Sequence, residues 1–326
     1  MRRESWFQKL STVLILCFVM SIGFSVSVFA SGVTQTAVKA TTIPIKWDKP
    51  SYSSETVTAY YVFAGNDYNS AKQIAKLPAT TTSYNVPAAA GTTKYIMVKY
   101  DYKTTYGSKI YTSSVGSLYE GVTLPTKVTG VRQDKWWYYA LASDVKWTQV
   151  PGAKGYEIQA FNSKGKMVKS DKAYSSTKPS YSLGKLANGK RISNNSIYTF
   201  RVRAYTELNG SKYYGPWSDP AYLFTSPTIT SFKRSGSKLK IKWDKVDGAT
   251  SYSIYISTKA KSGYKKVKTV SAKKSSVTIK KFNKKKISKK KKYYCYVVTN
   301  KKVKGVTYPS GSEYYWKVGS ASRNWF

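Results

Sequence analysis

Histidine is absent from this 326-residue sequence, and cysteine and acidic residues are scarce. Histidine is the most common general base in enzymes and the most common metal ligand, so its absence removes the usual ways of building a catalytic or transition-metal site. The two cysteines, Cys17 and Cys295, are too few for a thiolate zinc site of the usual kind. No pair among the 15 Asp and Glu residues stands in a recognisable hydrolase context. The sequence therefore predicts a protein that is not an enzyme and that holds no cofactor and no metal.

One segment comes close to a phosphate-binding loop, from Gly184 to Arg191. Arg191 stands where that motif needs a metal-binding Ser or Thr, and no strand–loop–helix pattern surrounds it. We therefore predict an ordinary turn at this position.

Residues 1–30 have the pattern of a secretory signal peptide. Basic residues precede the apolar stretch Leu10–Phe29, and Ala30 completes a small-residue cleavage pattern. An apolar stretch of about 20 residues is also long enough for a membrane anchor. The cleavage pattern and the polar sequence that follows favour removal, so we expect a secreted protein without a membrane span after cleavage. Only Cys295 would then remain, which predicts a passive thiol and no intramolecular disulfide.

A domain-sized repeat organises the rest of the chain. The pattern W-x-x-V-x-G-A-x-x-Y begins at Trp147 and again at Trp243, and a looser copy begins at Trp47. The three tryptophans are 147 − 47 = 100 and 243 − 147 = 96 residues apart. This period is far longer than that of a solenoid, and it indicates tandem globular domains.

Each copy of the repeat has the local pattern of β-structure. Leu239, Ile241 and Trp243 alternate with lysines, as in a strand with one buried and one solvated face. Clusters of Gly, Pro, Asn and Ser punctuate the chain every 8 to 12 residues or so, as in a β-sandwich. No convincing helical periodicity occurs after residue 30, so we predict an all-β fold.

The repeated residues resemble fibronectin type III domains. The resemblance rests on the Trp, the Gly-Ala turn, the Tyr that follows, and a later aromatic strand at Tyr198 or Tyr294. It implies an immunoglobulin-like β-sandwich in which the Trp fills the core and the late Tyr forms a tyrosine corner, bonding back to the chain. The residues that we expect in these structural roles are Trp47, Trp147, Trp243, Tyr156, Tyr252, Tyr198 and Tyr294.

The repeats also set the predicted domain boundaries. We expect three tandem fibronectin-type-III-like sandwiches after the signal peptide, joined by short connections, in a secreted or cell-surface protein of Gram-positive bacterial type. The predicted segments are a polar leader at 31–40, a divergent first domain at 41–124, a second domain at 125–225, a third domain at 226–318 and a tail at 319–326.

Positive charge is concentrated in the third predicted domain. Residues 226–326 hold 27 Lys and Arg against 3 Asp and Glu, a net charge of 27 − 3 = +24 out of +40 for the whole chain. The two preceding domains carry 9 − 5 = +4 (residues 31–124) and 16 − 6 = +10 (residues 125–225). Charge of this density creates a positive potential that attracts polyanions in a salt-dependent way.

The densest lysine run is predicted to lie in the loop between the fifth and sixth strands of the third domain. We hypothesise that it docks on an anionic wall polymer or an acidic glycan, and the alternative is a solvated face that serves solubility. Lysine gives point charges without bidentate recognition, so nucleic acid would bind only non-specifically. The candidate residues are Lys280, Lys281, Lys284, Lys285, Lys286, Lys289, Lys290, Lys291 and Lys292.

Aromatic residues offer a second candidate surface. Trp136, Trp137, Tyr138 and Tyr139 are consecutive, and at a domain tip their rings could stack on sugars. On a strand, two of the four would point each way, and some must cap the core or the domain junction. The final pair Trp325-Phe326 is either a frayed tail or a docking hook, and the sequence does not choose between these. The predicted function is a non-catalytic extracellular binding or adhesion module, whose partners could include other surface proteins. The alternatives are a structural spacer and a carbohydrate-binding protein.

Overall fold

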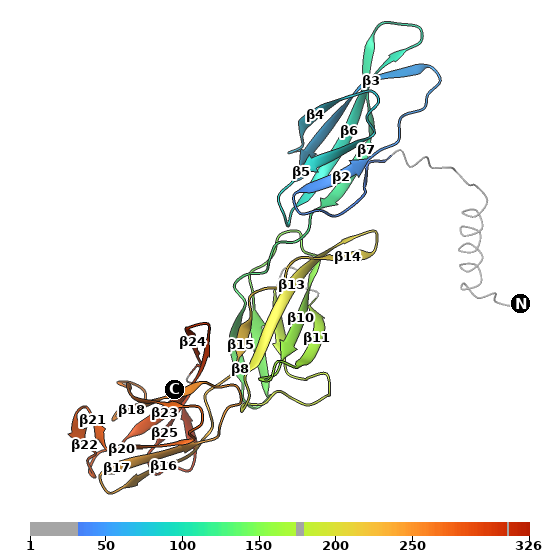
Figure 1. The fold of residues 1–326 in the computed structure, drawn as a ribbon. Helices are drawn as coiled ribbons and strands as arrows, with labels where there is room; N and C mark the ends of the chain where they lie inside the picture. Colours follow the sequence, from blue (N-terminus) through green and yellow to red (C-terminus); the bar gives the residue numbers. More distant parts are fainter. Residues whose placement is uncertain (1–31, 174–178, 312) are drawn as a thin grey trace, which may run out of the picture. The chain divides into compact units, whose positions relative to one another are not determined.

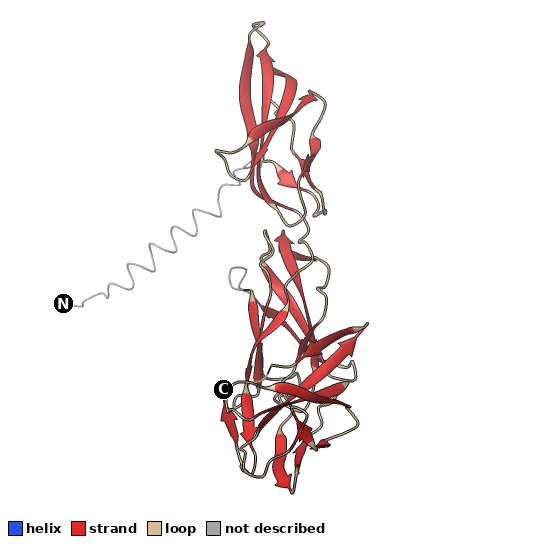
Figure 2. Cartoon of the chain, turned by 90° about the vertical axis from the view of Figure 1, so that its left-hand side faces the viewer, coloured by secondary structure: helices blue, strands red, loops and turns tan. Residues whose placement is uncertain are grey.

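A computed structural model describes residues 32–173, 179–311 and 313–326. The predicted signal peptide lies outside these residues. Every regular element of the described chain is a β-strand (Figure 2). No helix in this part of the chain is long and apolar enough to cross a membrane. The chain forms two compact units, and the second holds Val122–Phe326 together with two short earlier segments.

A two-sheet sandwich makes up most of the first unit (Figure 1). Its strands are β1 (Thr34–Gln35), β2 (Thr42–Lys46), β3 (Glu55–Gly65), β4 (Lys72–Pro78), β5 (Ser83–Pro87), β6 (Thr93–Thr104) and β7 (Ile110–Val122). One sheet has the order β1-β2-β5 and the other β4-β3-β6-β7. The buried ring of Trp47 lies 5.5 Å from that of Tyr60 on β3 and so joins the two sheets.

The second unit contains a sandwich whose strands are paired in the same order as those of the first. Its strands are β8 (Arg132–Trp137), β9 (Ala142–Lys146), β10 (Gly155–Phe161), β11 (Met167–Ala173), β12 (Ser180–Leu183), β13 (Tyr198–Leu208), β14 (Ser211–Tyr214) and β15 (Ala221–Leu223). One sheet is β12-β9-β8, and the other is β11-β10-β13-β14 with β15 also paired to β13.

The third sandwich follows in the same unit. Its strands are β16 (Ile229–Ser235), β17 (Lys238–Trp243), β18 (Ser251–Ser257), β19 (Lys265–Ser271), β20 (Ser276–Ile279), β21 (Lys281–Phe282), β22 (Lys285–Lys286), β23 (Tyr294–Val303), β24 (Val306–Pro309), β25 (Tyr314–Lys317) and β26 (Arg323–Trp325). The sheets are β16-β17-β20 and β19-β18-β23-β25-β26, with β24 paired to β23 and β21 paired to β22. The predicted all-β fold of tandem fibronectin-type-III-like sandwiches is confirmed.

The structure explains the W-x-x-V-x-G-A-x-x-Y pattern. In the second domain the amide of Val150 donates to the hydroxyl of the buried Tyr156 over 3.0 Å, and Gly152 supplies the positive φ of 67° that the intervening turn needs. The third domain repeats the bond between Val246 and Tyr252 at 2.7 Å. The pattern is therefore a turn closed by a tyrosine hydroxyl.

The packing of the tryptophan against the tyrosine of this pattern is also repeated. The ring of Trp147 lies 5.2 Å from Tyr156, and that of Trp243 lies 5.3 Å from Tyr252. All four side chains are buried. These contacts place the tryptophans in the cores, as the fibronectin type III resemblance implies.

The tyrosine corner is correct in the second domain and wrong by one residue in the third. The hydroxyl of Tyr198 accepts the amide of Ser193 over 3.0 Å. In the third domain the hydroxyl that accepts the equivalent amide, from Ser288, is that of Tyr293, also over 3.0 Å. Tyr294 instead points to the other side of the sheet, where its ring lies 5.7 Å from Tyr315.

A shortened hairpin is the physical reason for this error. Leu183 and Ile279 lie at equal distances after the domain tryptophans, at 183 − 147 = 36 and 279 − 243 = 36 positions. From there to the next buried isoleucine the second domain uses 192 − 183 = 9 positions and the third domain 287 − 279 = 8. One residue is missing from the intervening hairpin, so a fixed spacing from the Trp selects the wrong tyrosine.

The second and third domains are packed as one body. A single cluster of buried apolar side chains runs from Val128 through Trp316. The backbones also meet, because Ile197 donates to Asp247 and Asp247 donates to Asn195, both over 2.9 Å. These two sandwiches therefore share one hydrophobic core.

Two segments predicted to lie outside the sandwiches contain strands. β1 lies in the predicted polar leader and pairs with β2, with Gln35 opposite Ile45. β26 lies in the predicted tail and pairs with β25, with Trp325 opposite Tyr314. Gln35 is buried and Trp325 contacts other rings, so short sequences without clear alternation are held by the sheets they extend.

Candidate polyanion-binding site

The lysine run forms a defined hairpin rather than an open loop. β21 and β22 pair Lys281 with Lys286 and Phe282 with Lys285. The two residues between them, Asn283 and Lys284, have positive φ angles of 50° and 64°. Two consecutive left-handed residues are the signature of a type I′ turn, which suits the twist of a tight hairpin. The backbone therefore fixes the directions in which the lysines leave the domain.

Apolar side chains anchor this hairpin to the third domain. The ring of Phe282 lies 6.3 Å from that of Tyr293 in an edge-to-face arrangement. Ile287, directly after the hairpin, and Tyr293 are each 3% exposed. Because the apolar members of the run point inward, its lysines are left to point outward.

Arg234 on β16 holds the second half of the run. Its guanidinium donates to the carbonyl oxygens of Lys289 and Lys291 and lies 5.7 Å from the ring of Tyr293. The amide of Lys290 donates to the hydroxyl of Ser288 over 3.2 Å. Sequence reasoning missed Arg234, since it lies about 55 residues upstream and only the fold brings it here.

All of the predicted polyanion-binding lysines are exposed. In the described chain none of them forms an ion pair with a carboxylate. The third domain has only 3 acidic residues with which to neutralise them. The lysines that the structure brings together on this hairpin and the following loop are Lys280, Lys281, Lys284, Lys285, Lys286, Lys289, Lys290, Lys291 and Lys292.

The same connection in the second domain is also a hairpin. The amide of Leu186 donates to the carbonyl of Lys190 over 2.8 Å, and Gly189 takes a φ of 77° in the turn. This is the segment that resembles a phosphate-binding loop, and it is a turn that leads back to the sheet. Arg191 donates to the carbonyl of Ala140 over 2.5 Å and so is tied to its own domain.

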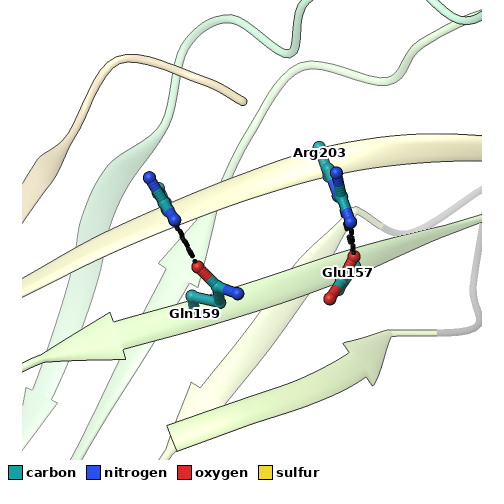
Figure 3. Close-up of polar contacts among 4 residues, drawn as sticks. Glu157, Gln159 and Arg203 are labelled. Carbon is teal, nitrogen blue, oxygen red and sulfur yellow. Dashed lines mark hydrogen bonds and ion pairs between the residues drawn. The ribbon is translucent and has the colours of Figure 1, made fainter. Parts of the chain in front are cut away.

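On the outer sheet face of the second domain the arginines have partners within the domain. The guanidinium of Arg203 on β13 forms an ion pair with the carboxylate of Glu157 on β10 over 2.6 Å (Figure 3). The guanidinium of Arg201 donates to the amide oxygen of Gln159 over 2.6 Å. The ring of Trp217 lies 4.4 Å from the guanidinium of Arg201 and 4.5 Å from that of Arg203. Sequence reasoning did not find this ladder, although Arg201-Val-Arg203 on an alternating strand was a usable signal. These cations already have partners, whereas the lysines of the hairpin and its following loop form no ion pair in the described chain.

The predicted glycan-stacking surface is not a surface of four free rings. Trp136 is 2% exposed and donates to Asn194 over 2.8 Å, and Tyr138 is 9% exposed. Trp137 remains 43% exposed and Tyr139 86%. Trp136 and Trp137 end β8 and face opposite sides of the sheet, as consecutive strand residues do, while Tyr138 and Tyr139 lie in the turn that follows. Trp137 and Tyr139 are thus the two of the four candidate rings that solvent can reach.

Tyr138 belongs to the junction of the second and third domains. Its ring lies 5.7 Å from Tyr314 and 5.6 Å from Trp325, and its hydroxyl bonds to that of Thr225. The guanidinium of Arg323 lies 5.3 Å from the Tyr138 ring and 5.0 Å from that of Trp325. Burial raises the pKa of Tyr138 to about 12, although the Thr225 hydroxyl opposes part of that rise.

The tail that carries Trp325 and Phe326 is docked. β26 extends the sheet beyond β25, and the Phe326 ring lies 5.1 Å from Tyr315 and 5.5 Å from Tyr264. The frayed-tail interpretation is therefore wrong, and the ring of Trp325 packs against Tyr138 of the same chain.

Two further features bear on reactivity. The side chain of Cys295 is fully buried, and burial raises the pKa of its thiol, which keeps it protonated and unreactive. Among the described residues no group of three or more His, Cys, Asp or Glu side chains is placed to hold a metal ion.

Comparison with known proteins gives structural neighbours without a sequence match. No protein-family profile and no curated protein matches the chain. The FN1–FN3 domains of chicken CNTN1 (contactin) are 14% identical, with a TM-score of 0.34, and the match covers 88% of this chain and 96% of that one. A segment of two fibronectin type III domains from chicken tenascin is 13% identical, with a TM-score of 0.33, covering 59% of this chain and 97% of that one.

Proposed function

We propose that this protein is a secreted, non-catalytic binding module whose third domain docks on an anionic extracellular polymer, either an anionic wall polymer or an acidic glycan. The observation that carries the proposal is the lysine hairpin with its following loop. Its lysines are exposed, lack carboxylate partners in the described chain, and stand on a backbone that Arg234, Phe282 and Ile287 hold in place.

The fixed backbone favours binding as opposed to mere solubility. A flexible lysine run must be ordered when it binds, and that ordering costs free energy. A hairpin that is already ordered avoids the backbone part of this cost. Lysine ammonium groups act as point charges, so the surface should respond to charge density along a polymer more than to a particular arrangement of groups.

A matched pair of variants tests the site. The mature chain is titrated with purified teichoic acid and with alginate at low salt, using K284Q/K285Q/K286Q as the hairpin variant. The control is K238Q/K240Q/K242Q, which removes three exposed lysines from β17 of the same domain. Exposed ion pairs contribute about 0.5 kcal/mol each, so losing three should weaken binding roughly tenfold in the hairpin variant.

The outcomes separate docking from a diffuse charge effect. We expect the control to lose much less affinity than the hairpin variant, and binding to both polymers to fall steeply with salt. Equal losses in the two variants would mean that total charge decides, as in a spacer with a soluble surface. No binding to either polymer at low salt would overturn the proposal.

Secretion has its own test. The pattern at residues 1–30 predicts cleavage after Ala30, so the protein recovered outside cells should begin at Ser31. N-terminal sequencing of secreted protein measures this directly. A protein that keeps residues 1–30 and sediments with membranes would support the anchor alternative instead.

A further inference from the structure

Two loops meet at one end of the first domain. One joins β2 to β3 and contains Tyr52, and the other joins β6 to β7 and contains Tyr106 (Figure 1). The amide and the hydroxyl of Thr105 both donate to the carbonyl of Ser54, over 2.9 and 3.1 Å. The first of these loops lies between Trp47 and Tyr60, which are 60 − 47 = 13 positions apart, against 156 − 147 = 9 for the equivalent pair in the second domain. We call this pair of loops, residues 48–54 and 104–111, the first-domain tip.

The first-domain tip exposes three aromatic side chains and one aliphatic side chain. Tyr106 is 94% exposed and Tyr52 is 62% exposed. Ile110 and Tyr111 at the start of β7 are 54% and 40% exposed. Single exposed apolar side chains are common in proteins, but a group of them on adjoining loops indicates an interaction surface.

The sheet beneath supports Tyr111 at the base of the tip. The ring of Tyr111 stacks on Tyr102, with centroids 5.6 Å apart and planes at 28°. Tyr102 in turn lies 5.6 Å from Tyr100, which lies 6.3 Å from the fully buried Tyr60. A continuous line of rings therefore runs from the core to the surface, and it holds the base of the tip in one arrangement.

Charge at the first-domain tip is nearly balanced, in contrast to the lysine hairpin. Its charged residues and their immediate strand neighbours are Lys49, Lys103 and Lys109 against Asp48 and Glu55, a net charge of 3 − 2 = +1. The ammonium of Lys109 also lies over the Tyr111 ring, at 5.3 Å from its centroid. A polyanion gains little from such a surface, so the ligand that fits it is uncharged.

The chemistry of the first-domain tip matches that of sugars. Its loops read Pro-Ser-Tyr-Ser-Ser and Thr-Thr-Tyr-Gly-Ser, which combine flat amphipathic rings with hydroxyl groups. Tyrosine gives a large contact area at low entropic cost, and small hydroxyl residues supply adaptable hydrogen bonds. A pyranose presents an apolar C–H face to a ring and hydroxyls at its rim. We propose that the first-domain tip binds an uncharged polysaccharide.

This second site would make the protein a bridge between two polymers of different chemistry. The first-domain tip and the lysine hairpin belong to different compact units, so each can be tested without altering the other. The proposal stands whether or not the third domain docks on polyanions, because it rests on other residues and another force.

The experiment is a glycan array of neutral oligosaccharides probed with the mature chain in about 0.5 M NaCl, where the Debye length is below about 5 Å and lysine-driven binding is suppressed. The test variant is Y52S/Y106S. The control is Y68S/Y119S, which removes two tyrosines of the same domain that are 68% and 77% exposed but lie outside the tip.

We expect wild-type protein to retain a set of neutral glycans, the test variant to bind them at least about tenfold more weakly, and the control to stay within about twofold. The proposal is overturned if wild-type protein retains no neutral glycan, or if the two variants bind alike. It is also overturned if the test variant changes only self-association in size-exclusion chromatography, since the tip would then be a protein interface.

Discussion

The second and third domains build the same connection from different side chains. In both, the chain leaves a buried residue (Leu183 or Ile279), makes a hairpin, buries an isoleucine (Ile192 or Ile287) and reaches the corner tyrosine. The second domain fills its hairpin with mixed residues, whereas the third fills it with lysine. The scaffold thus determines where the loop stands, and the outward side chains determine what it can bind.

The turns of the two hairpins differ as well. The second domain places Gly189 at its left-handed position, where nothing crowds the site of a Cβ. The third places Lys284 at φ 64°, which costs a residue with a Cβ about 1 kcal/mol. The third domain therefore keeps a lysine where glycine would be more stable, which agrees with a binding role for the hairpin.

The largest expected effect tests whether the two domains are one folding unit. Trp147→Ala and Trp243→Ala should each lower the free energy of unfolding by about 3–5 kcal/mol, because each leaves a cavity in the shared core. Urea titrations followed by circular dichroism and by reactivity of the Cys295 thiol should give coincident transitions for both variants. Trp137→Ala, at a side chain that is 43% exposed, is the control and should cost less than about 1 kcal/mol. If Trp147→Ala melts part of the structure while Cys295 stays protected, the domains fold separately.

The next effect concerns the junction at high pH. The folded pKa of Tyr138 is about 12 and its unfolded value is 10.0, so the neutral form is favoured in the fold. Its contribution is fully present below pH 10 and is lost as the pH rises toward about 12, at about 1.4 kcal/mol per pH unit. Tyr138→Phe should reduce the slope by this one group's share, measured by urea unfolding between pH 9 and about 11.5. The remaining slope comes from other tyrosines whose pKa burial also raises, among them Tyr181, Tyr264 and Tyr314. An unchanged slope in Tyr138→Phe would contradict the assignment.

A smaller effect tests the corrected tyrosine corner. Tyr198→Phe and Tyr293→Phe each leave a backbone amide without its acceptor, and each should cost about 1 kcal/mol of unfolding free energy. Tyr294→Phe should change stability by less than about 0.5 kcal/mol. Chemical denaturation of the three variants measures this. A larger loss at Tyr294 than at Tyr293 would restore the spacing derived from the sequence.

The smallest effect concerns the two turns. Lys284→Gly should stabilise the protein by about 0.5–1 kcal/mol, because the type I′ turn prefers Asn-Gly. Gly189→Ala should destabilise it by about 1 kcal/mol through its positive φ alone. Thermal denaturation is the measurement. If Lys284→Gly also weakens binding to teichoic acid by more than about threefold, Lys284 contributes directly to docking; otherwise its neighbours carry the contact.

Features repeated along the chain were accessible from the sequence. The W-x-x-V-x-G-A-x-x-Y pattern predicts the buried Trp243, the turn and Tyr252, because these residues interact with one another within a few positions and do so in both copies that carry the pattern. The alternation in β17 likewise predicts which lysines face solvent. The same logic fails where the copies differ in length, because a fixed spacing from the tryptophan then predicts Tyr294 as the corner residue in place of Tyr293.

Features made by distant segments were not accessible. The sequence shows four aromatic residues at 136–139, but whether they meet solvent depends on Tyr314 and Trp325, far along the chain. Arg234 carries no local sign that it will hold Lys289 and Lys291. Likewise the two loops of the first-domain tip come together only because β3, β6 and β7 are neighbours in one sheet. In each case the decisive contact is set by topology, which a single sequence leaves open.

The position of β26 has a consequence for how the chain is made. Arg323 and Trp325 complete the junction on Tyr138, yet residues 32–318 are all synthesised before them. Until β26 emerges, the second domain must carry the rings of Tyr138 and Tyr139 without their last partners. Residues 323–325 therefore complete the contacts of Tyr138, and a chain cut before residue 323 would keep the core that the two domains share but would lack the Trp325 ring and the Arg323 guanidinium beside Tyr138.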